Sequence, residues 1–123
     1  MTPDIAGIWE LAGRALAPDG SELYQWTAQV TIRPDLSVTL QTRGERLSRS
    51  HSYSERIRAL PDGQWKLTYG YEMEPDSGAP EGYDYFGMSQ LTIAPDLQTA
   101  KGNSCNWNGT RYVVMELALT RAS

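Results

Sequence analysis

Six of the seven prolines in this chain are followed immediately by aspartate, at residues 3, 18, 34, 61, 75 and 95. Proline fixes the backbone angle at the second position of a tight turn, and the aspartate side chain hydrogen-bonds to nearby backbone. The segments between these pairs are rich in Val, Ile, Thr, Tyr and Trp, and they alternate apolar with polar residues. Such alternation is typical of half-buried strands. The sequence therefore predicts a meander of short antiparallel strands.

Eight strands are predicted between these turns, and no long window shows helical periodicity. They span residues 7–16, 23–33, 36–43, 49–59, 64–73, 85–94, 98–107 and 111–120. A chain of 123 residues is large enough for one domain with a real core, so we expect a single domain over residues 1–123. Sequential strands of this length close into an up-and-down barrel, which removes both sheet edges. The predicted fold is all-β, an eight-stranded antiparallel up-and-down barrel.

The direction of the chain sorts the connections between the two ends of this barrel. The turns at 33–36, 60–63 and 94–97 share one end, and each contains a Pro-Asp pair. The other end carries the Pro18 turn, the 44–48 link, the long 74–84 loop and the Asn108-Gly109 turn. We call these the tight end and the open end. This asymmetry is typical of a cup.

The predicted inward faces change in character between the two ends. Near the tight end they are aliphatic: Val30, Ile32, Val38, Ile57, Leu67, Leu91, Ile93, Leu117 and Leu119. Toward the open end they are aromatic or polar: Tyr24, Trp26, His51, Tyr53, Tyr69, Tyr71, Tyr85, Ser104, Asn106, Arg111 and Met115. A ligand pocket needs flat faces and a few polar groups, so the open end is predicted to bind a ligand. The register of the polar fourth and seventh predicted strands, at 49–59 and 98–107, stays open, because a shift of one residue exchanges His51 and Tyr53 with neighbouring serines.

Composition excludes several classes of function. Eleven basic and fifteen acidic residues argue against non-specific binding to long nucleic acid. Cys105 is the only cysteine, so no internal disulfide forms and a reducing compartment is expected. The sequence shows neither an apolar run of about 18 residues nor a signal peptide. We therefore expect a cytoplasmic chain, or the cytosolic domain of a membrane-anchored protein, with no membrane contact of its own.

Catalytic and metal-binding motifs are not recognisable in the sequence. His51 is the sole histidine, and together with one distant cysteine it makes a poor ligand set. The aspartates at positions 19, 35, 62 and 96 are predicted to be turn residues. We therefore expect neither metal, cofactor nor catalysis, although some barrels isomerise or hydrate the molecules they bind.

The first predicted strand opens with Gly7-Ile8-Trp9, and Arg121 follows the apolar run at 117–120. This pairing resembles the lipocalin and wider calycin superfamily, whose members are eight-stranded barrels. The resemblance implies that Trp9 packs under Arg121 at the tight end, a cation–π contact of about 0.5–2 kcal/mol. It also keeps open an alternative function, the carriage of a small hydrophobic molecule.

A narrower resemblance lies in the second half of the chain. Its segments are WKLTYGY at 65–71, FGMSQLTI at 86–93, Gly102, Asn106, Gly109-Thr110-Arg111 and LALTR at 117–121. This order resembles the β-barrel sensor domain of bacterial CBASS anti-phage effectors, in which two transmembrane helices precede an eight-stranded barrel. The resemblance implies that the barrel binds a cyclic dinucleotide, and that binding drives assembly of a membrane-disrupting part.

The predicted ligand is therefore a cyclic dinucleotide or a related nucleotide. Aromatic side chains would stack on its bases, and arginines would meet its phosphates through their planar fork of donors. Asn106, Ser104 and Thr27 would read base or ribose edges. The candidate binding residues are Arg111, Trp26, Tyr53, Tyr69, Tyr71, Tyr85, Asn106, Ser104, Thr27 and Arg43. A two-fold symmetric ligand also suits a symmetric homodimer.

A third hypothesis belongs to a different class of protein. The chain would be a structural interaction module whose barrel is filled by its own side chains. It would then contain no cavity larger than about one or two waters.

Overall fold

The chain folds into a closed antiparallel barrel whose strands follow one another in sequence order. A computed structural model describes residues 2–43, 49–74, 86–107 and 111–122. The strands are β1 (Gly7–Leu16), β2 (Glu22–Ile32), β3 (Val38–Arg43), β4 (Arg49–Ala59), β5 (Trp65–Glu74), β6 (Phe86–Ile93), β7 (Thr99–Trp107) and β8 (Tyr112–Arg121). The predicted all-β, eight-stranded barrel is confirmed. Every strand begins and ends within two residues of its predicted bounds.

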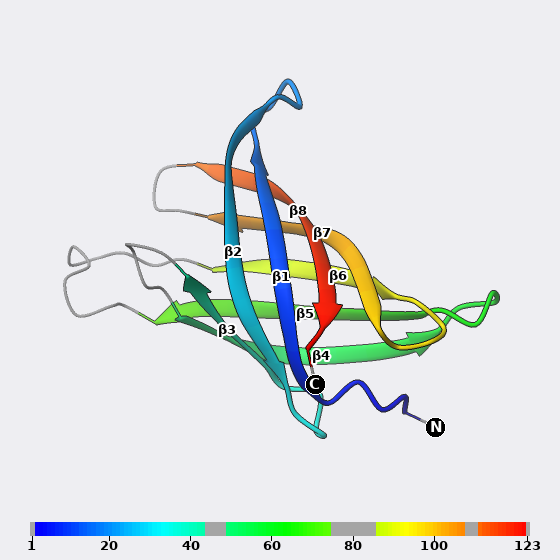
Figure 1. Ribbon diagram of the computed structural model, residues 1–123. Helices are drawn as coiled ribbons and strands as arrows, with labels where there is room; N and C mark the ends of the chain where they lie inside the picture. The colour runs from blue at the N-terminus through cyan, green and yellow to red at the C-terminus, as the bar shows by residue number, and fades with distance from the viewer. Residues whose placement is uncertain (1, 44–48, 75–85, 108–110, 123) are drawn as a thin grey trace.

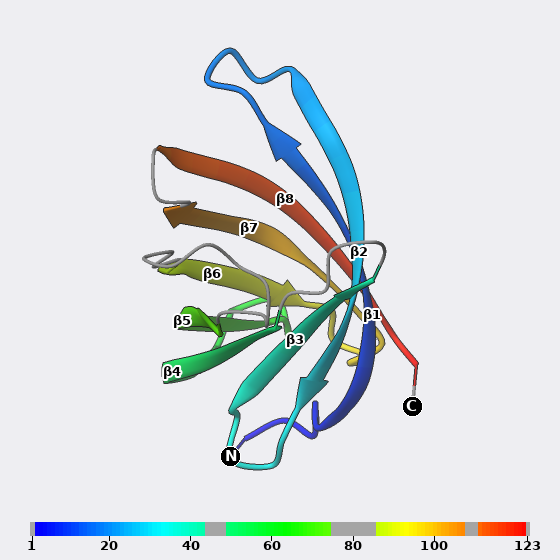
Figure 2. The same cartoon turned by 90° about the vertical axis from the view of Figure 1, so that its left-hand side faces the viewer.

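The barrel has two walls that cross one another. β1 and β2 form one wall with β8, and β4, β5 and β6 form the opposite wall (Figure 1). The β1–β2 hairpin extends beyond its neighbours at the top of Figure 1, whereas both termini lie at the lower end. β3 connects the two walls (Figure 2), and among the described residues it pairs with β4 through Thr39, Leu40 and Gln41.

Four of the Pro-Asp pairs form the same turn. The carboxylates of Asp19, Asp35, Asp62 and Asp96 each accept a hydrogen bond from the backbone N–H two residues later, at 2.9, 2.9, 3.1 and 3.0 Å. Hydrogen bonds from the hydroxyl and backbone of the following serine lower the pKa of Asp19 and Asp35. These aspartates are turn residues, as predicted.

The residue after each of these aspartates has a left-handed backbone. The φ angles are 88° at Gly20 and 86° at Gly63, where glycine adopts them without steric cost. They are 72° at Leu36 and 62° at Leu97, where the Cβ is strained. Both leucines pack against the hydrophobic core, so burial offsets the strain at these two turns.

The tight end is filled by a conventional core. Trp9 is 1% exposed, and its Nε1 donates a hydrogen bond to the Ile5 carbonyl at 3.0 Å. The Arg121 guanidinium lies 5.6 Å from the centroid of the Trp9 ring. The same guanidinium donates hydrogen bonds to the carbonyls of Asp4 and Ala6 at 2.8 and 2.6 Å. The predicted Trp9–Arg121 contact is confirmed, and it ties the N-terminal segment to the last strand.

A bulge in β4 determines which of its side chains face the interior. Tyr53 pairs with Gly70 and Arg56 pairs with Thr68, so β4 holds one residue more than β5 over this stretch. Ser54 takes the extra position with a φ of 55°. One additional residue reverses the alternation along the rest of a strand.

The N-terminal half of β4 is therefore in the opposite register from the one expected. Ser50 is buried and Ser52 half-buried, whereas His51 and Tyr53 are exposed on the outer face. The inward placement of His51 and Tyr53 was wrong. The Ser52 hydroxyl accepts a hydrogen bond from the Val38 N–H at 2.7 Å across the short β3–β4 seam, which only the serine register provides.

Candidate ligand-binding site

The inner face at the open end brings together five of the predicted site residues. Trp26 lies on β2, Tyr69 and Tyr71 on β5, and Ser104 and Asn106 on β7. Each is buried or half-buried and belongs to the inward set of its strand. Because side chains two apart share a face, the pairs on β5 and β7 stand side by side on the lining.

Two glycines let aromatic rings lie flat against the barrel wall. A Cβ on Gly13 would lie 2.3 Å from the Trp26 ring, and a Cβ on Gly87 would lie 2.6 Å from the Tyr71 hydroxyl. No side chain larger than hydrogen therefore fits at either position. The sequence analysis did not single out Gly13. The feature of the sequence that could have indicated it is a glycine inside a strand of alternating apolar and polar residues.

The two tyrosines of β5 present neutral hydroxyls inside the barrel. Their ring centroids lie 6.4 Å apart, with the rings inclined at 57°. Burial raises the pKa of Tyr69 to about 12, an effect that a hydrogen bond with Ser89 partly offsets. Burial also raises the pKa of Tyr71, whose hydroxyl lies 2.7 Å from the Ser104 hydroxyl. At neutral pH Tyr69, Tyr71 and Ser104 therefore offer hydrogen-bonding groups and no charge.

Two polar atoms in this lining are buried without a hydrogen-bond partner among the described residues. They are Trp26 Nε1, a donor, and Asn106 Oδ1, an acceptor. Leaving such a group unsatisfied costs about 1–3 kcal/mol, and native proteins rarely tolerate it without a reason. A ligand with its own donors and acceptors would satisfy both atoms.

Three predicted site residues lie on the outer face instead. Tyr53 is displaced by the bulge described above. Thr27 follows Trp26 directly, and adjacent strand residues cannot both face inward. Arg43 pairs with Thr27 on β3, and its guanidinium donates to the Glu10 carboxylate at 2.8 Å. Thr27 and Arg43 were predicted to contact the ligand, but both are exposed on the outer face and do not belong to the inner lining.

Two predicted site residues, Arg111 and Tyr85, remain. Arg111 is exposed directly before β8 begins, so its guanidinium is not part of the buried lining. Tyr85 lies outside the described residues.

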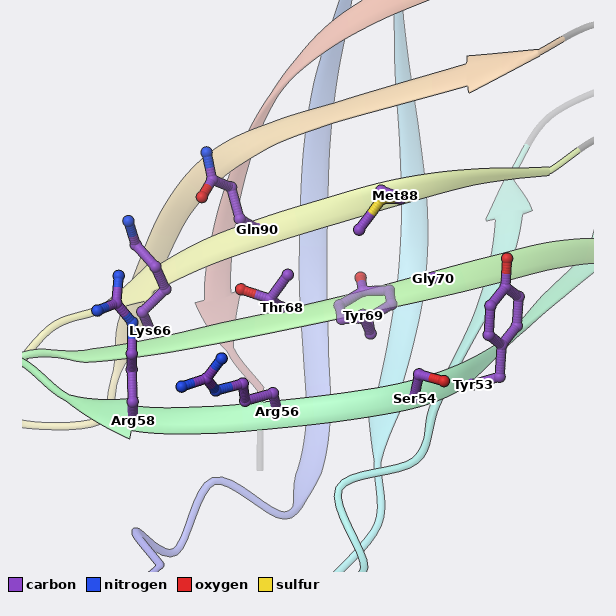
Figure 3. A pocket seen from close by; sticks show the side chains of 10 residues that line it. All are labelled: Tyr53, Ser54, Arg56, Arg58, Lys66, Thr68, Tyr69, Gly70, Met88 and Gln90. Carbon is purple, nitrogen blue, oxygen red and sulfur yellow. The ribbon is translucent and has the colours of Figure 1, made fainter.

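A second concave surface lies on the outside of the barrel, over β4, β5 and β6. This groove of about 390 Å³ is lined by three cations, by polar groups, by the Tyr53 ring and by the apolar side chain of Met88. The labelled side chains lie in front of the wall and β1 passes behind it, with Tyr69 seen through the β5 ribbon (Figure 3). The sequence analysis missed this groove. In the sequence, the feature that could have indicated this groove is the position of Arg56 and Arg58 on one side of the 60–63 turn and of Lys66 on the other.

Other kinds of site find no support in the described part of the chain. It contains no cluster of three or more His, Cys, Asp or Glu side chains that could hold a metal ion. A search of the same residues finds no helix with the length and hydropathy needed to cross a bilayer.

The fold and its lining define a β-barrel receptor for a small molecule. The family model for the Cap15 cyclic dinucleotide receptor domain matches residues 1–121, and the chain belongs to this family. No curated protein matches the chain. The chain therefore has a cyclic-dinucleotide-sensing role in CBASS, as the resemblance implied, and the match does not favour a carrier of hydrophobic molecules.

Proposed function

We propose that the cyclic dinucleotide binds inside the barrel at the open end, against the lining formed by β2, β5 and β7. The observation that carries this assignment is the pair of buried, unsatisfied atoms, Trp26 Nε1 and Asn106 Oδ1. Nucleobases carry amino and imino donors for Asn106 and ring or carbonyl acceptors for Trp26. The flat faces of Trp26 and Tyr71 offer stacking surfaces, each worth about 1–3 kcal/mol.

The phosphates require positive charge that the buried lining does not provide. Arg111 is exposed at the same end, and its planar fork of donors suits phosphate oxygens. The ligand would thus insert its bases and leave its phosphates near the mouth. Burying phosphate deeper without a cation would cost several kcal/mol.

We infer that binding is non-catalytic. The candidate lining consists of tyrosine, serine, asparagine and tryptophan side chains, and burial keeps Tyr69 and Tyr71 protonated at neutral pH. General acid–base work is most efficient when the pKa lies near the operating pH, and the hydroxyl of Tyr69 is far from it. A cytoplasmic location follows from the ligand class, a second messenger inside the cell.

Self-association upon binding is a further part of the proposal. Four exposed apolar side chains, Phe86, Met88, Tyr112 and Val114, lie on β6 and β8. Exposed apolar side chains on nearby strands are typical of a contact site, and a two-fold ligand suits a symmetric dimer. Light scattering after size exclusion, with and without ligand, would measure the change in mass. An unchanged mass under saturating ligand would contradict this part.

The experiment that tests the interior site is calorimetric titration of a panel of cyclic dinucleotides against wild type and Asn106→Leu. Leucine removes the unsatisfied oxygen, so the ligand-free barrel should be as stable as wild type or more so. Affinity should fall about 10-fold or more, since the base loses its acceptor. If the role of Asn106 were purely structural, the variant would not lose affinity while keeping its stability.

The matched control is Thr27→Val on the outer face, which should leave affinity unchanged. Equal affinity for wild type and Asn106→Leu would place the ligand elsewhere. No binding across the whole panel would contradict the sensing role itself.

A further inference from the structure

The outer groove over β4, β5 and β6 carries a concentration of positive charge. Arg56, Arg58 and Lys66 all line it, and Arg58 sits directly opposite Lys66 across the β4–β5 ladder. Like charges in directly opposed positions destabilise a sheet. Over the ranges that the structure describes, none of the three forms an ion pair. This holds although the whole chain has a net charge of −4.

The rest of the groove supplies neutral recognition groups. Thr68 and Gln90 pair across β5 and β6 and place a hydroxyl and an amide beside the cations. Tyr53 lies toward the other end of the groove (Figure 3), with its ring 2.5 Å from where a Cβ on Gly70 would be. The ring therefore lies close over the strand, and 42% of Tyr53 remains exposed.

We propose that this groove is a second site, which binds a phosphorylated small molecule of nucleotide size. Arg56, Arg58 and Lys66 would hold its phosphates, because guanidinium groups match phosphate oxygens in a bidentate manner. Tyr53 would stack on its planar ring. Side chains on opposite faces of β5 serve the two sites, so this inference goes beyond the interior function and does not depend on it.

A phospholipid headgroup shares the phosphate chemistry, but the groove is concave. A volume of about 390 Å³ matches a small molecule in size, whereas a bilayer surface presents its phosphates to a flat or convex face. The nucleotide is therefore the favoured source, and vesicles form the second arm of the test.

The test is calorimetric titration of the chain with ADP, with adenosine, and with vesicles containing phosphatidylglycerol, at low and at high salt. ADP should bind, adenosine should bind at least 10-fold more weakly, and salt should weaken ADP binding because exposed charges are screened. The double variant Arg56→Gln/Arg58→Gln should lose at least 10-fold in ADP affinity. Tyr53→Leu should lose a smaller factor, about 3-fold.

The matched control is Arg33→Gln, which removes one exposed cation in the β2–β3 turn, outside the groove. It should bind ADP as wild type does. Failure of ADP to bind would overturn the proposal, and so would an equal loss in Arg33→Gln. Binding to vesicles without binding to ADP would also overturn it in favour of a lipid surface.

Two crossed measurements separate this site from the interior one. Asn106→Leu should bind ADP as wild type does, and the double arginine variant should still bind the cyclic dinucleotide. If the double variant lost the cyclic dinucleotide while Asn106→Leu kept it, the groove would be the cyclic dinucleotide site. That result would overturn both assignments. Thermal unfolding of each variant would confirm that the barrel is intact.

Discussion

The inner and outer faces of β5 differ more in charge and burial than the two ends of the barrel do. Tyr69 and Tyr71 point inward, where burial keeps them neutral. Lys66, Thr68 and Gly70 point outward into the basic groove. The two sets are interleaved one residue apart, because successive side chains of a strand face opposite sides. A single strand can therefore carry two recognition chemistries, and only its register keeps them apart.

The bulge at Ser54 is the device that maintains this separation on β4. Deleting Ser54 should destabilise the barrel by about 3–5 kcal/mol or more, since it must turn either His51 and Tyr53 or Arg56 and Arg58 inward. Burying an arginine without a partner is costly. Urea unfolding, followed by tryptophan fluorescence, would measure the loss.

The matched control is Ser54→Gly, which keeps the extra residue. Glycine adopts the observed φ of 55° without strain, so the free energy of unfolding should change by less than about 1 kcal/mol. A deletion variant as stable as wild type would show that the register is not fixed by the bulge.

The strand layout was predictable because its signals are local. Pro-Asp pairs mark four equivalent turns, and each aspartate binds the backbone two residues later. The alternation between turns then placed Trp26, Tyr69, Tyr71, Ser104 and Asn106 on the inner face. Neither signal depends on contacts between distant strands.

The errors arose where the answer depends on such contacts. The β4 bulge is fixed by pairing with β5 and by the hydrogen bond from Val38 to Ser52, so the sequence alone could not place Tyr53. Thr27 adjoins Trp26 on one strand, so it lies on the outer face and outside the inner lining. The outer groove was missed because isolated arginines on an outward face read as ordinary solvated charges. Their convergence appears only when β4, β5 and β6 are side by side.

Two glycines offer a direct comparison of the faces. A Cβ on Gly87, on the inner face, would lie 2.4 Å from the Cys105 carbonyl oxygen. Gly87→Ala should therefore cost about 2–3 kcal/mol, since a neighbouring strand must shift. A Cβ on Gly70, on the outer face, meets only the exposed ring of Tyr53, which can rotate away. Gly70→Ala should cost less than about 1 kcal/mol.

Thermal and urea unfolding of the two alanine variants would measure this difference. Gly87→Ala should also weaken cyclic dinucleotide binding, because the added methyl displaces the Tyr71 ring from its place in the lining. Equal costs at the two glycines would show that the strand beside Gly87 yields as readily as the exposed Tyr53 ring does.

The buried hydroxyl of Tyr69 predicts a loss of stability at alkaline pH. Its pKa is about 12 in the folded chain, against about 10 for a solvated tyrosine. The folded state therefore holds this proton more tightly, and the associated stability is fully present below pH 10 and lost as pH rises toward 12. The loss should reach about 2 kcal/mol near pH 11.5.

Urea unfolding at pH 9 and pH 11.5 would measure this effect in wild type and in Tyr69→Phe. The phenylalanine variant should start less stable by about 1 kcal/mol, since it loses the bond with Ser89, but it should decline less between the two pH values. An identical decline in both proteins would mean that Tyr69 is not the buried titrating group. Other tyrosines and lysines titrate equally in the two proteins and cancel.

The smallest effect expected concerns the repulsion between Arg58 and Lys66 on the outer face. Arg58→Gln removes one of two like charges that oppose each other across β4 and β5, so it should raise the free energy of unfolding by about 0.2–0.5 kcal/mol. The gain should shrink in high salt, since exposed charges are screened. Arg33→Gln, in the β2–β3 turn beside Asp35, should show no gain because Asp35 lies within electrostatic reach. A salt-independent loss in Arg58→Gln would mean that the guanidinium supports the fold, and the groove would then need no anion to explain its charge.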